Sequence, residues 1–542
     1  MRPKLKHKRD KGLKNIFNTP NDVVVNSFKI PNEILNDKLT GKIVWYMNTS
    51  YSFSITNIYF NKSTVTYDKI LCTYCFLYNS IYFKFFHLIN FYGIPKKIKN
   101  NIQKISSPRK FCRNNDILKS EECLKQFETN EENDEVRTGK FDYIIENNNT
   151  NISCSKLILN NKKYAKNISL SRYIIEKENN LDSNCHSIKE RGFGNATGTS
   201  FIEEKYSLAF ARNVYRSYEI VELILLAQYS KNNHYCYTVD SKFPGLYEKM
   251  KQLEQCLPNV YVMEKQYDFQ SNGKYTSIAH FQCMKFLLTK EWNYMFLHQM
   301  DDIAIKTNRQ MLEILEAMDF PLDMAFNIFN EDIDKIINLN FSWTYNDLNI
   351  FLEGDGRRSN PKIMNQKVTF QKSNVPCGMN RETVDYIVNK INITTFLNEL
   401  NTNLHGHDEL TWSTLLTDNI LNIPGSIPRQ CISIYYPKRV SLSRLVIKTK
   451  GMCRSENLYD KVCIFDVKRI GKLLHYFPFF VYKFKEDRDF GALKCWVNFM
   501  YYQNNFMKHE VLNIWYFYSL PQSLYRKMIL TNKFNIKEKC KS

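Results

Sequence analysis

From residue 206 onward, the chain alternates between patterns typical of short strands and patterns typical of helices. Apolar, β-branched and aromatic runs are followed by stretches in which apolar residues recur with helical spacing. The predicted strands are 206–213, 234–240, 259–264 and 294–300, and the predicted helices are 218–228, 243–257, 277–288 and 308–318. Because repeated strand–helix–strand units build sheets covered by helices on both faces, we predict an α/β fold with a parallel or mostly parallel sheet.

Sheets of this kind bind nucleotides beyond the carboxyl ends of their strands. The sequence has no Gly-x-Gly-x-x-Gly fingerprint and no P-loop, which disfavours a dinucleotide-dependent enzyme and a P-loop kinase. Hydrophobic residues make up 43% of the 542 residues and aromatic residues 14%, enough for a large buried core. We therefore expect a folded domain rather than a disordered chain.

The formal net charge of +20 is compatible with three kinds of partner: nucleic acid, an anionic membrane surface, or an anionic small substrate such as a nucleotide sugar. Only residues 1–14 form a dense basic run, and the other basic residues are scattered. No zinc-finger spacing, RNA-recognition signature or arginine-rich motif is present. We therefore do not expect a nucleic-acid partner.

The first 200 residues divide into three segments by composition. Residues 1–69 read as a basic cytoplasmic tail, and residues 70–94 are apolar and long enough for a signal-anchor helix. Lys84 and His87 make that helix a poor membrane span, so a buried amphipathic element remains an alternative. Residues 95–200 are rich in Asn, Lys and Glu and read as a stem.

The remaining residues, 201–542, form the predicted catalytic domain, with a core at about 206–500. Glycosylation sequons occur in both the stem and this domain, at Asn148, Asn151, Asn167, Asn195, Asn340 and Asn392. Together they fit a luminal location, although an Asn-rich chain acquires sequons by chance.

Fifteen cysteines are spread along the chain, and the single Cys-x-x-Cys, at Cys72 and Cys75, lies inside an apolar run. A zinc site there is disfavoured. Scattered cysteines suit a disulfide-bonded luminal domain, with free buried thiols as the alternative.

Six sequence blocks follow one another in a characteristic order. They are YCYTVDSK at 235–242, HQMDDIAIKTN at 298–308, PCGMNRETVDYIV at 376–388, HDELTWSTLL at 407–416 followed by NIPGSIP at 422–428, KVCIFD at 461–466, and YKF at 482–484. In this order and spacing they resemble the core-2/I-branching β-1,6-N-acetylglucosaminyltransferases of glycosyltransferase family 14. The resemblance extends over about residues 154–500.

The resemblance implies a GT-A-like nucleotide-sugar-binding fold behind an N-terminal anchor and stem. It implies an inverting enzyme that moves N-acetylglucosamine from UDP-GlcNAc to a hydroxyl of a glycan or glycoprotein in β-1,6 linkage, without a metal or other cofactor. The implied location is the Golgi membrane, as a single-pass type II protein with a luminal catalytic domain. A peptide O-xylosyltransferase-like enzyme and a catalytically silent, glycan-binding relative are the alternatives.

Glu409 in HDELTW matches the glutamate that acts as the general base in this family. Inversion by one displacement needs one base to take the proton of the acceptor hydroxyl, a task that suits a carboxylate. The adjacent Asp408 should point elsewhere, because neighbouring helical residues do not share a face. Taken without the family, the Asp-Glu pair would read as the acidic first turn of a helix.

Three further residues are implied to bind the donor: Asp240, Lys461 and Lys483. Lys483 matches the lysine that the family uses as counter-charge to the leaving diphosphate. The arginine expected two residues before Val462 is Asp460 here, with Lys461 one place later and Arg454 as another candidate. This departure motivates the silent alternative. Asp240 matches a position near the uridine, although a strand-end acid can equally cap a helix.

Asp301 and Asp302 are adjacent acids, but they lack the alternate spacing of an Asp-x-Asp metal clamp, and we expect no metal site. The resemblance also implies four disulfides: Cys154–Cys495, Cys185–Cys256, Cys236–Cys283 and Cys453–Cys463. The cysteine positions alone do not determine this pairing.

Overall fold

The computed structural model describes most of the chain after residue 150. The described residues are 151–175, 181–194, 200–327, 333–436, 441–448, 453, 455, 457–506, 512, 514–532, 535 and 540, with short strands before them. Three of those strands, β1 (Val23–Val25), β2 (Val44–Met47) and β3 (Phe53–Asn57), pair antiparallel within the segment predicted as a tail. The candidate signal anchor at 70–94 lies outside the described residues.

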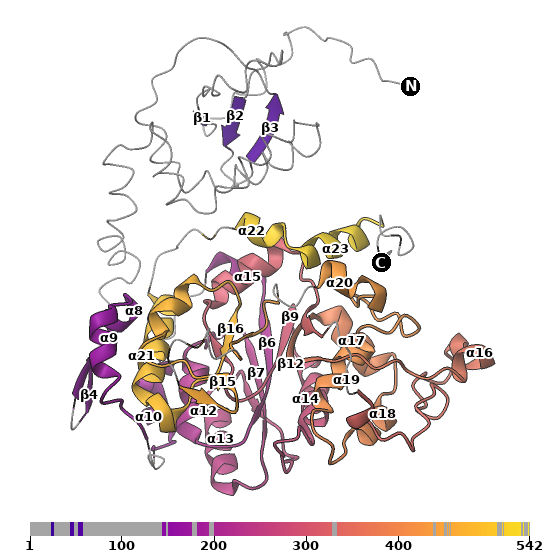
Figure 1. Ribbon diagram of the computed structural model, residues 1–542, viewed down its shortest axis with the longest axis horizontal. Coiled ribbons are helices and arrows are strands. Elements are labelled where there is room, and N and C mark those ends of the chain that lie inside the picture. The colour runs from indigo at the N-terminus through magenta and orange to yellow at the C-terminus, as the bar shows by residue number, and fades with distance from the viewer. Residues whose placement is uncertain are drawn as a thin grey trace. The chain divides into compact units, whose positions relative to one another are not determined.

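A six-stranded sheet runs through the middle of the folded unit (Figure 1), in the order β11-β12-β9-β6-β7-β8. Its strands are β6 (Leu208–Val214), β7 (His234–Val239), β8 (Val260–Val262), β9 (Tyr294–His298), β11 (Asp323–Phe326) and β12 (Ser373–Asn380). β6 pairs parallel with both β7 and β9, β7 pairs parallel with β8, and β12 runs antiparallel to both of its neighbours. The predicted α/β fold with a mostly parallel sheet is confirmed.

Both faces of this sheet are buried because its strands alternate between two apolar cores. Along β6, Leu208 and Phe210 point into one core, and Ala209 and Ala211 into the other. This is the two-residue period of a strand. It explains why the strands read as nearly continuous apolar runs, as expected of a parallel sheet covered on both sides.

Helices cover the two faces in separate groups (Figure 1). The first group is α12 (Tyr218–Leu226), α13 (Pro244–Cys256), α15 (Asn308–Ala317) and α21 (Glu486–Asn505). The second is α14 (Thr276–Leu287), α17 (Arg381–Asn389), α18 (Thr394–Leu400) and α19 (Asp408–Leu415). The other α-helices described are α8 (Cys154–Ile158), α9 (Lys162–Ile168), α10 (Cys185–Ile188), α11 (Phe201–Lys205), α16 (Pro361–Met364), α20 (Ile432–Tyr435), α22 (Ile514–Tyr518) and α23 (Pro521–Leu530).

Smaller β elements complete the fold. A second sheet has the order β10-β16-β13, formed by β10 (Ile303–Ala304), β16 (Phe480–Tyr482) and β13 (Leu445–Val446). Two hairpins pair β4 (Ile144–Asn147) with β5 (Thr150–Ser153) and β14 (Leu458–Tyr459) with β15 (Val462–Cys463). The second sheet positions predicted site residues. β10 directly follows Asp301 and Asp302, which form an acidic turn, and β16 ends at Tyr482, directly before Lys483.

Residues 151–175 belong to the predicted stem by composition, yet they pack on α21. Ile152 and Leu157 are buried in the first core, and the Phe490 amide donates a 2.6 Å hydrogen bond to the Tyr173 carbonyl. The folded part therefore begins before the predicted boundary at residue 201. The polar residues between the apolar ones hide this packing from a composition argument.

All four disulfides implied by the resemblance are present in the structure. A fifth, Cys431–Cys540, joins the residue before α20 to the C-terminal region and was not predicted. Among the cysteines described, Cys377 is the free one, and it is buried.

Of the helices that the structure describes, none has the length and apolar character needed to cross a membrane.

Candidate functional site

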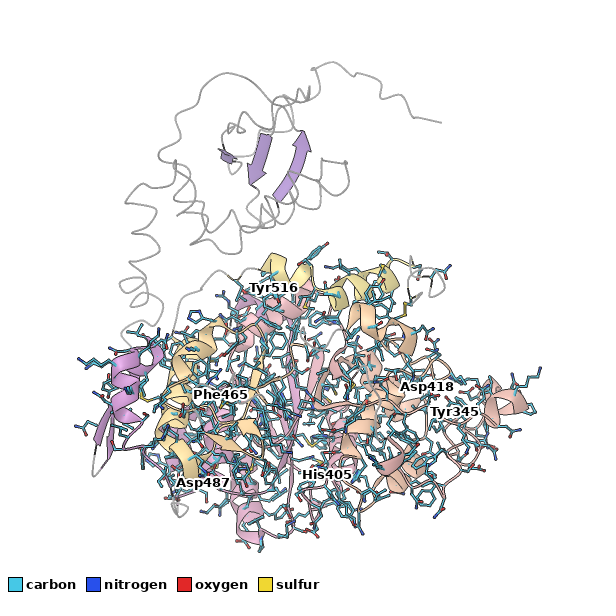
Figure 2. The ribbon with its side chains drawn as sticks, viewed as in Figure 1. Tyr345, His405, Asp418, Phe465, Asp487 and Tyr516 are labelled. Atoms are coloured by element: carbon cyan, nitrogen blue, oxygen red, sulfur yellow. A yellow bond between two sulfur atoms is a disulfide. The ribbon has the colours of Figure 1, made fainter. Side chains whose placement is uncertain are left out.

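The predicted site residues come from both sides of the central sheet. Asp240 follows β7 and Asp301 follows β9, at the carboxyl ends of two parallel strands. Glu409 comes from α19 on one face, and Lys483 follows β16 on the other. Figure 2 shows the same division: His405, just before α19, lies toward α14 and α18, whereas Phe465 lies near α21.

Glu409 lies in the first turn of α19, and 31% of its side chain is exposed. Its carboxylate oxygen Oε2 lies 3.1 Å from the Lys372 ammonium. Lys372 is held in place by its backbone, since its carbonyl accepts a 2.7 Å hydrogen bond from the Asn327 amide. The preceding residue, Gln371, is fastened to α19, because the Ser413 hydroxyl donates to its carbonyl at 2.5 Å. Glu409 is therefore an oriented and accessible carboxylate.

Asp408 has a different environment from its neighbour. Its side chain is 7% exposed and lies against Gly273, where a Cβ would overlap the carboxylate. Gly273 has a φ of +99°, which suits glycine. Burial, together with the charge of Glu409, raises the pKa of Asp408 to about 7. Because only Glu409 is accessible, the structure separates the two acids as the sequence predicts.

The loop before α19 is joined to the loop before α14 by hydrogen bonds. The Gly406 amide donates to the Asn272 carbonyl at 2.9 Å, and the Tyr275 amide donates to the Asn401 side chain at 2.7 Å. Further along, the Ser277 hydroxyl donates to Thr411 at 2.9 Å. These contacts fix the start of α19, and hence Glu409, relative to the central sheet.

Asp240 is almost fully buried, with 1% of its surface exposed. Its Oδ1 accepts a 2.9 Å hydrogen bond from the Lys242 amide, and its Oδ2 lies 3.2 Å from the Lys242 ammonium. The carboxylate thus stabilises the turn after β7. This matches the structural role expected of an acid at the end of a strand. The structure does not test the predicted contact between Asp240 and uridine.

Each carboxylate of the acidic turn is paired with an arginine. Asp301 binds Arg216. Both oxygens of Asp302 accept hydrogen bonds from Arg444, one from Nε at 2.5 Å and one from Nη2. Burial opposes ionisation of Asp301, but the nearby positive charges, led by Arg216, outweigh it and lower its pKa. Within the described part of the chain, no group of three or more His, Cys, Asp or Glu side chains could hold a metal ion.

Lys483 is 6% exposed, and its ammonium lies 4.3 Å from the centre of the Tyr459 ring. Burial lowers the pKa of this amine, and the Asp301 charge partly opposes that effect. The Phe465 amide donates a 3.1 Å hydrogen bond to the Lys483 carbonyl, which ties β16 to the segment after β15. Lys483 is therefore a buried cation at the same sheet end as the acidic turn.

Asp460 and Lys461 form the exposed turn between β14 and β15, with φ values of 47° and 63°. Two positive φ angles are the mark of a type I′ hairpin, a conformation that Asp tolerates better than most residues. Asp460 thus has a local structural reason to replace the expected arginine. The Cys453–Cys463 disulfide fastens this hairpin. Arg454, the other candidate, lies outside the described residues.

Four basic residues near the site were missed by the sequence argument: Arg216, Lys372, Arg444 and Lys485. Arg444 also places its guanidinium 4.3 Å from the centre of the Tyr482 ring, beside Lys483. Each is a basic residue outside the six sequence blocks, with no recognisable motif of its own. Only their partners, up to 270 residues away in the case of Arg216 and Glu486, reveal their role.

Comparison with known proteins agrees with this geometry. Residues 208–442 match the family model described as "Core-2/I-Branching enzyme". The chain is 24% identical to the Danio rerio "Beta-1,3-galactosyl-O-glycosyl-glycoprotein beta-1,6-N-acetylglucosaminyltransferase 4", over 58% of this chain and 74% of the relative. It is 23% identical to a Bos taurus "Beta-1,3-galactosyl-O-glycosyl-glycoprotein beta-1,6-N-acetylglucosaminyltransferase", over 66% and 87%. It is also 23% identical to the Homo sapiens "Beta-1,3-galactosyl-O-glycosyl-glycoprotein beta-1,6-N-acetylglucosaminyltransferase 3", over 56% of this chain and 69% of the relative. Residues 208–442 therefore match the core-2/I-branching enzyme family, and the chain is similar over a longer stretch to proteins named as β-1,6-N-acetylglucosaminyltransferases.

Proposed function

We propose that this protein is an inverting glycosyltransferase that moves N-acetylglucosamine from UDP-GlcNAc to a hydroxyl of a glycan or glycoprotein, in β-1,6 linkage. The observation that carries the proposal is the accessible Glu409 carboxylate on α19, combined with the buried Lys483 ammonium after β16. One group can accept a proton, and the other can offset negative charge. The match of residues 208–442 to the core-2/I-branching family supports the same reaction.

In the proposed reaction, Glu409 takes the proton of the acceptor hydroxyl as the oxygen attacks the anomeric carbon of the donor sugar. The bond between that carbon and the diphosphate oxygen breaks, and its electron pair leaves with UDP. Lys483 offsets the charge of the leaving diphosphate, and Lys461, in the exposed turn of the neighbouring hairpin, is proposed to add an outer contact to the same group. Fixed cations of this kind stabilise a departing anion strongly.

Asp240 is proposed to lie near the uridine. Its two carboxylate oxygens already hold the Lys242 amide and ammonium, so it would act by keeping the turn after β7 in place. We further propose that the reaction needs no metal. Support comes from Asp301 and Asp302, whose carboxylates are already paired with Arg216 and Arg444.

The test is transfer of radiolabelled sugar by the purified full-length chain. We expect transfer from UDP-GlcNAc to a core-1 type disaccharide, unaffected by EDTA, with the new linkage identified as β-1,6 by methylation analysis. Transfer only from UDP-xylose to a peptide serine would instead establish the xylosyltransferase-like alternative. Binding of UDP without transfer to any acceptor would establish the silent relative that Asp460 suggests.

We also propose residence in the Golgi membrane as a single-pass type II protein, with the catalytic domain in the lumen. Five disulfides suit an oxidising compartment. The sequon residues Asn151, Asn167 and Asn340 are exposed. We expect a mobility shift after glycosidase treatment and resistance to alkaline extraction. A protein without glycans that is released by alkaline extraction would contradict this location.

A further inference from the structure

The Tyr459 ring lies beside two lysine ammonium groups. Lys483 Nζ is 4.3 Å from the ring centre, and Lys485 Nζ is 4.9 Å from it. Lys483 is buried and Lys485 is half-buried. Among the described contacts, neither ammonium forms an ion pair with a carboxylate. Both cations therefore lie beside the Tyr459 ring, and Lys483 also lies 5.2 Å from the centre of the Tyr482 ring.

This arrangement is costly without an anion. Removing an ammonium from water disfavours its charge, and two like charges near one ring repel each other. A cation–π contact compensates only in part. Asp301 and Glu486 are engaged by Arg216, and Asp460, in the exposed turn next to Tyr459, forms no ion pair with either lysine among the described contacts. One buried and one half-buried ammonium, neither in an ion pair among the described contacts, are suited to binding a phosphate group.

We propose that Lys485 is the second cation of the diphosphate site and takes the place of the arginine missing at position 460. The inference rests on the proposed function, since it assumes that Lys483 faces the donor diphosphate. Lys485 and Lys483 share the Tyr459 ring, whereas Lys461 is exposed at the hairpin turn.

Lys485 also has a fixed backbone. It precedes α21, and its carbonyl accepts hydrogen bonds from the amides of Arg488 at 3.1 Å and Asp489 at 2.8 Å. The next residue, Glu486, holds Arg216 at 2.7 Å. The start of α21 therefore presents Lys485 from a rigid position, and little ordering is needed when the donor binds.

The experiment is calorimetry of UDP binding to the full-length chain in EDTA. We compare wild type with Lys485→Met, Lys485→Arg, Lys483→Met and Lys461→Met. The matched control is Lys494→Met, on the same helix, whose ammonium lies 5.2 Å from the Phe490 ring centre. Uridine 5′-monophosphate serves as a second ligand, because it lacks the distal phosphate.

We expect Lys485→Met to weaken UDP binding about ten- to a hundredfold, Lys485→Arg to restore most of it, and Lys494→Met to leave it within about twofold. The loss should be smaller for the monophosphate than for UDP. The inference is wrong if Lys485→Met binds UDP like wild type while Lys483→Met does not, or if Lys461→Met weakens binding more than Lys485→Met. Wild type that fails to bind UDP would instead refute the proposed function itself.

Discussion

Replacing Glu409 with glutamine should remove catalysis while leaving the fold intact. The side chain keeps its shape but can no longer accept a proton. A positioned general base contributes about 10²- to 10⁴-fold, so we expect turnover to fall at least about a hundredfold, or about 2.7 kcal/mol. Donor binding should persist, because Lys483 and the cations around it are unchanged.

The stability cost of the same change follows from its contacts. Glu409 loses a 3.1 Å ion pair with Lys372, and both side chains are partly exposed, at 31% and 25%. Solvent screening limits such a pair to about 1 kcal/mol or less. The lost first-turn charge of α19 costs about 0.3–1 kcal/mol more. The fall in activity should therefore far exceed anything that a loss of folded protein could cause.

The assay is transfer of radiolabelled N-acetylglucosamine at saturating donor, with UDP affinity measured by calorimetry and stability by thermal unfolding. Glu382→Gln is the matched control, because Glu382 is also an exposed acid in the first turn of a helix, α17. We expect that control to retain nearly normal turnover. If Glu409→Gln keeps turnover within about tenfold of wild type, Glu409 is not the base.

Three further predictions concern positioning, pH and stability. Because the ion pair with Lys372 orients Glu409, Lys372→Met should lower kcat several-fold and leave UDP affinity within about twofold. Lys372→Arg should restore kcat. An unchanged kcat in Lys372→Met would show that the ion pair does not contribute to catalysis. Burial, the largest cause in each case, raises the pKa of both Asp408 and Asp489 to about 7, so the folded chain binds protons there that the unfolded chain releases near pH 4. The free energy of unfolding from urea titrations should therefore rise as pH falls from 8 to about 6.5. Below that pH, buried histidines oppose the rise, because the unfolded chain binds protons that they do not; burial lowers the pKa of His280 to about 4. A flat or opposite trend above pH 6.5 would contradict these assignments. Replacing both Cys431 and Cys540 with serine should lower that free energy by up to about 4.7 kcal/mol, since the bridge spans 109 residues; an unchanged urea midpoint would show that this bridge contributes nothing.

The sequence alone determined the elements whose signals are local. Strand and helix periods from residue 206 onward predicted β6, β7, β9 and the helices between them, because a buried strand or an amphipathic helix is encoded within a few consecutive residues. The family motifs named Glu409 and Lys483, and the resemblance implied four disulfide pairs that the structure contains. The bridge to Cys540 had no such motif to indicate it.

Only the tertiary structure decided which charges meet. Arg444 reaches Asp302 across 142 residues, and Lys372 reaches Glu409 because Gln371 is fastened to α19. No periodic pattern carries this information, since an ion pair depends on where two distant segments end up in space. The same is true of Lys485, which reads as an ordinary basic residue before a helix. It lies beside the Tyr459 ring, and so near Lys483, only because the hairpin brings that ring to the start of α21.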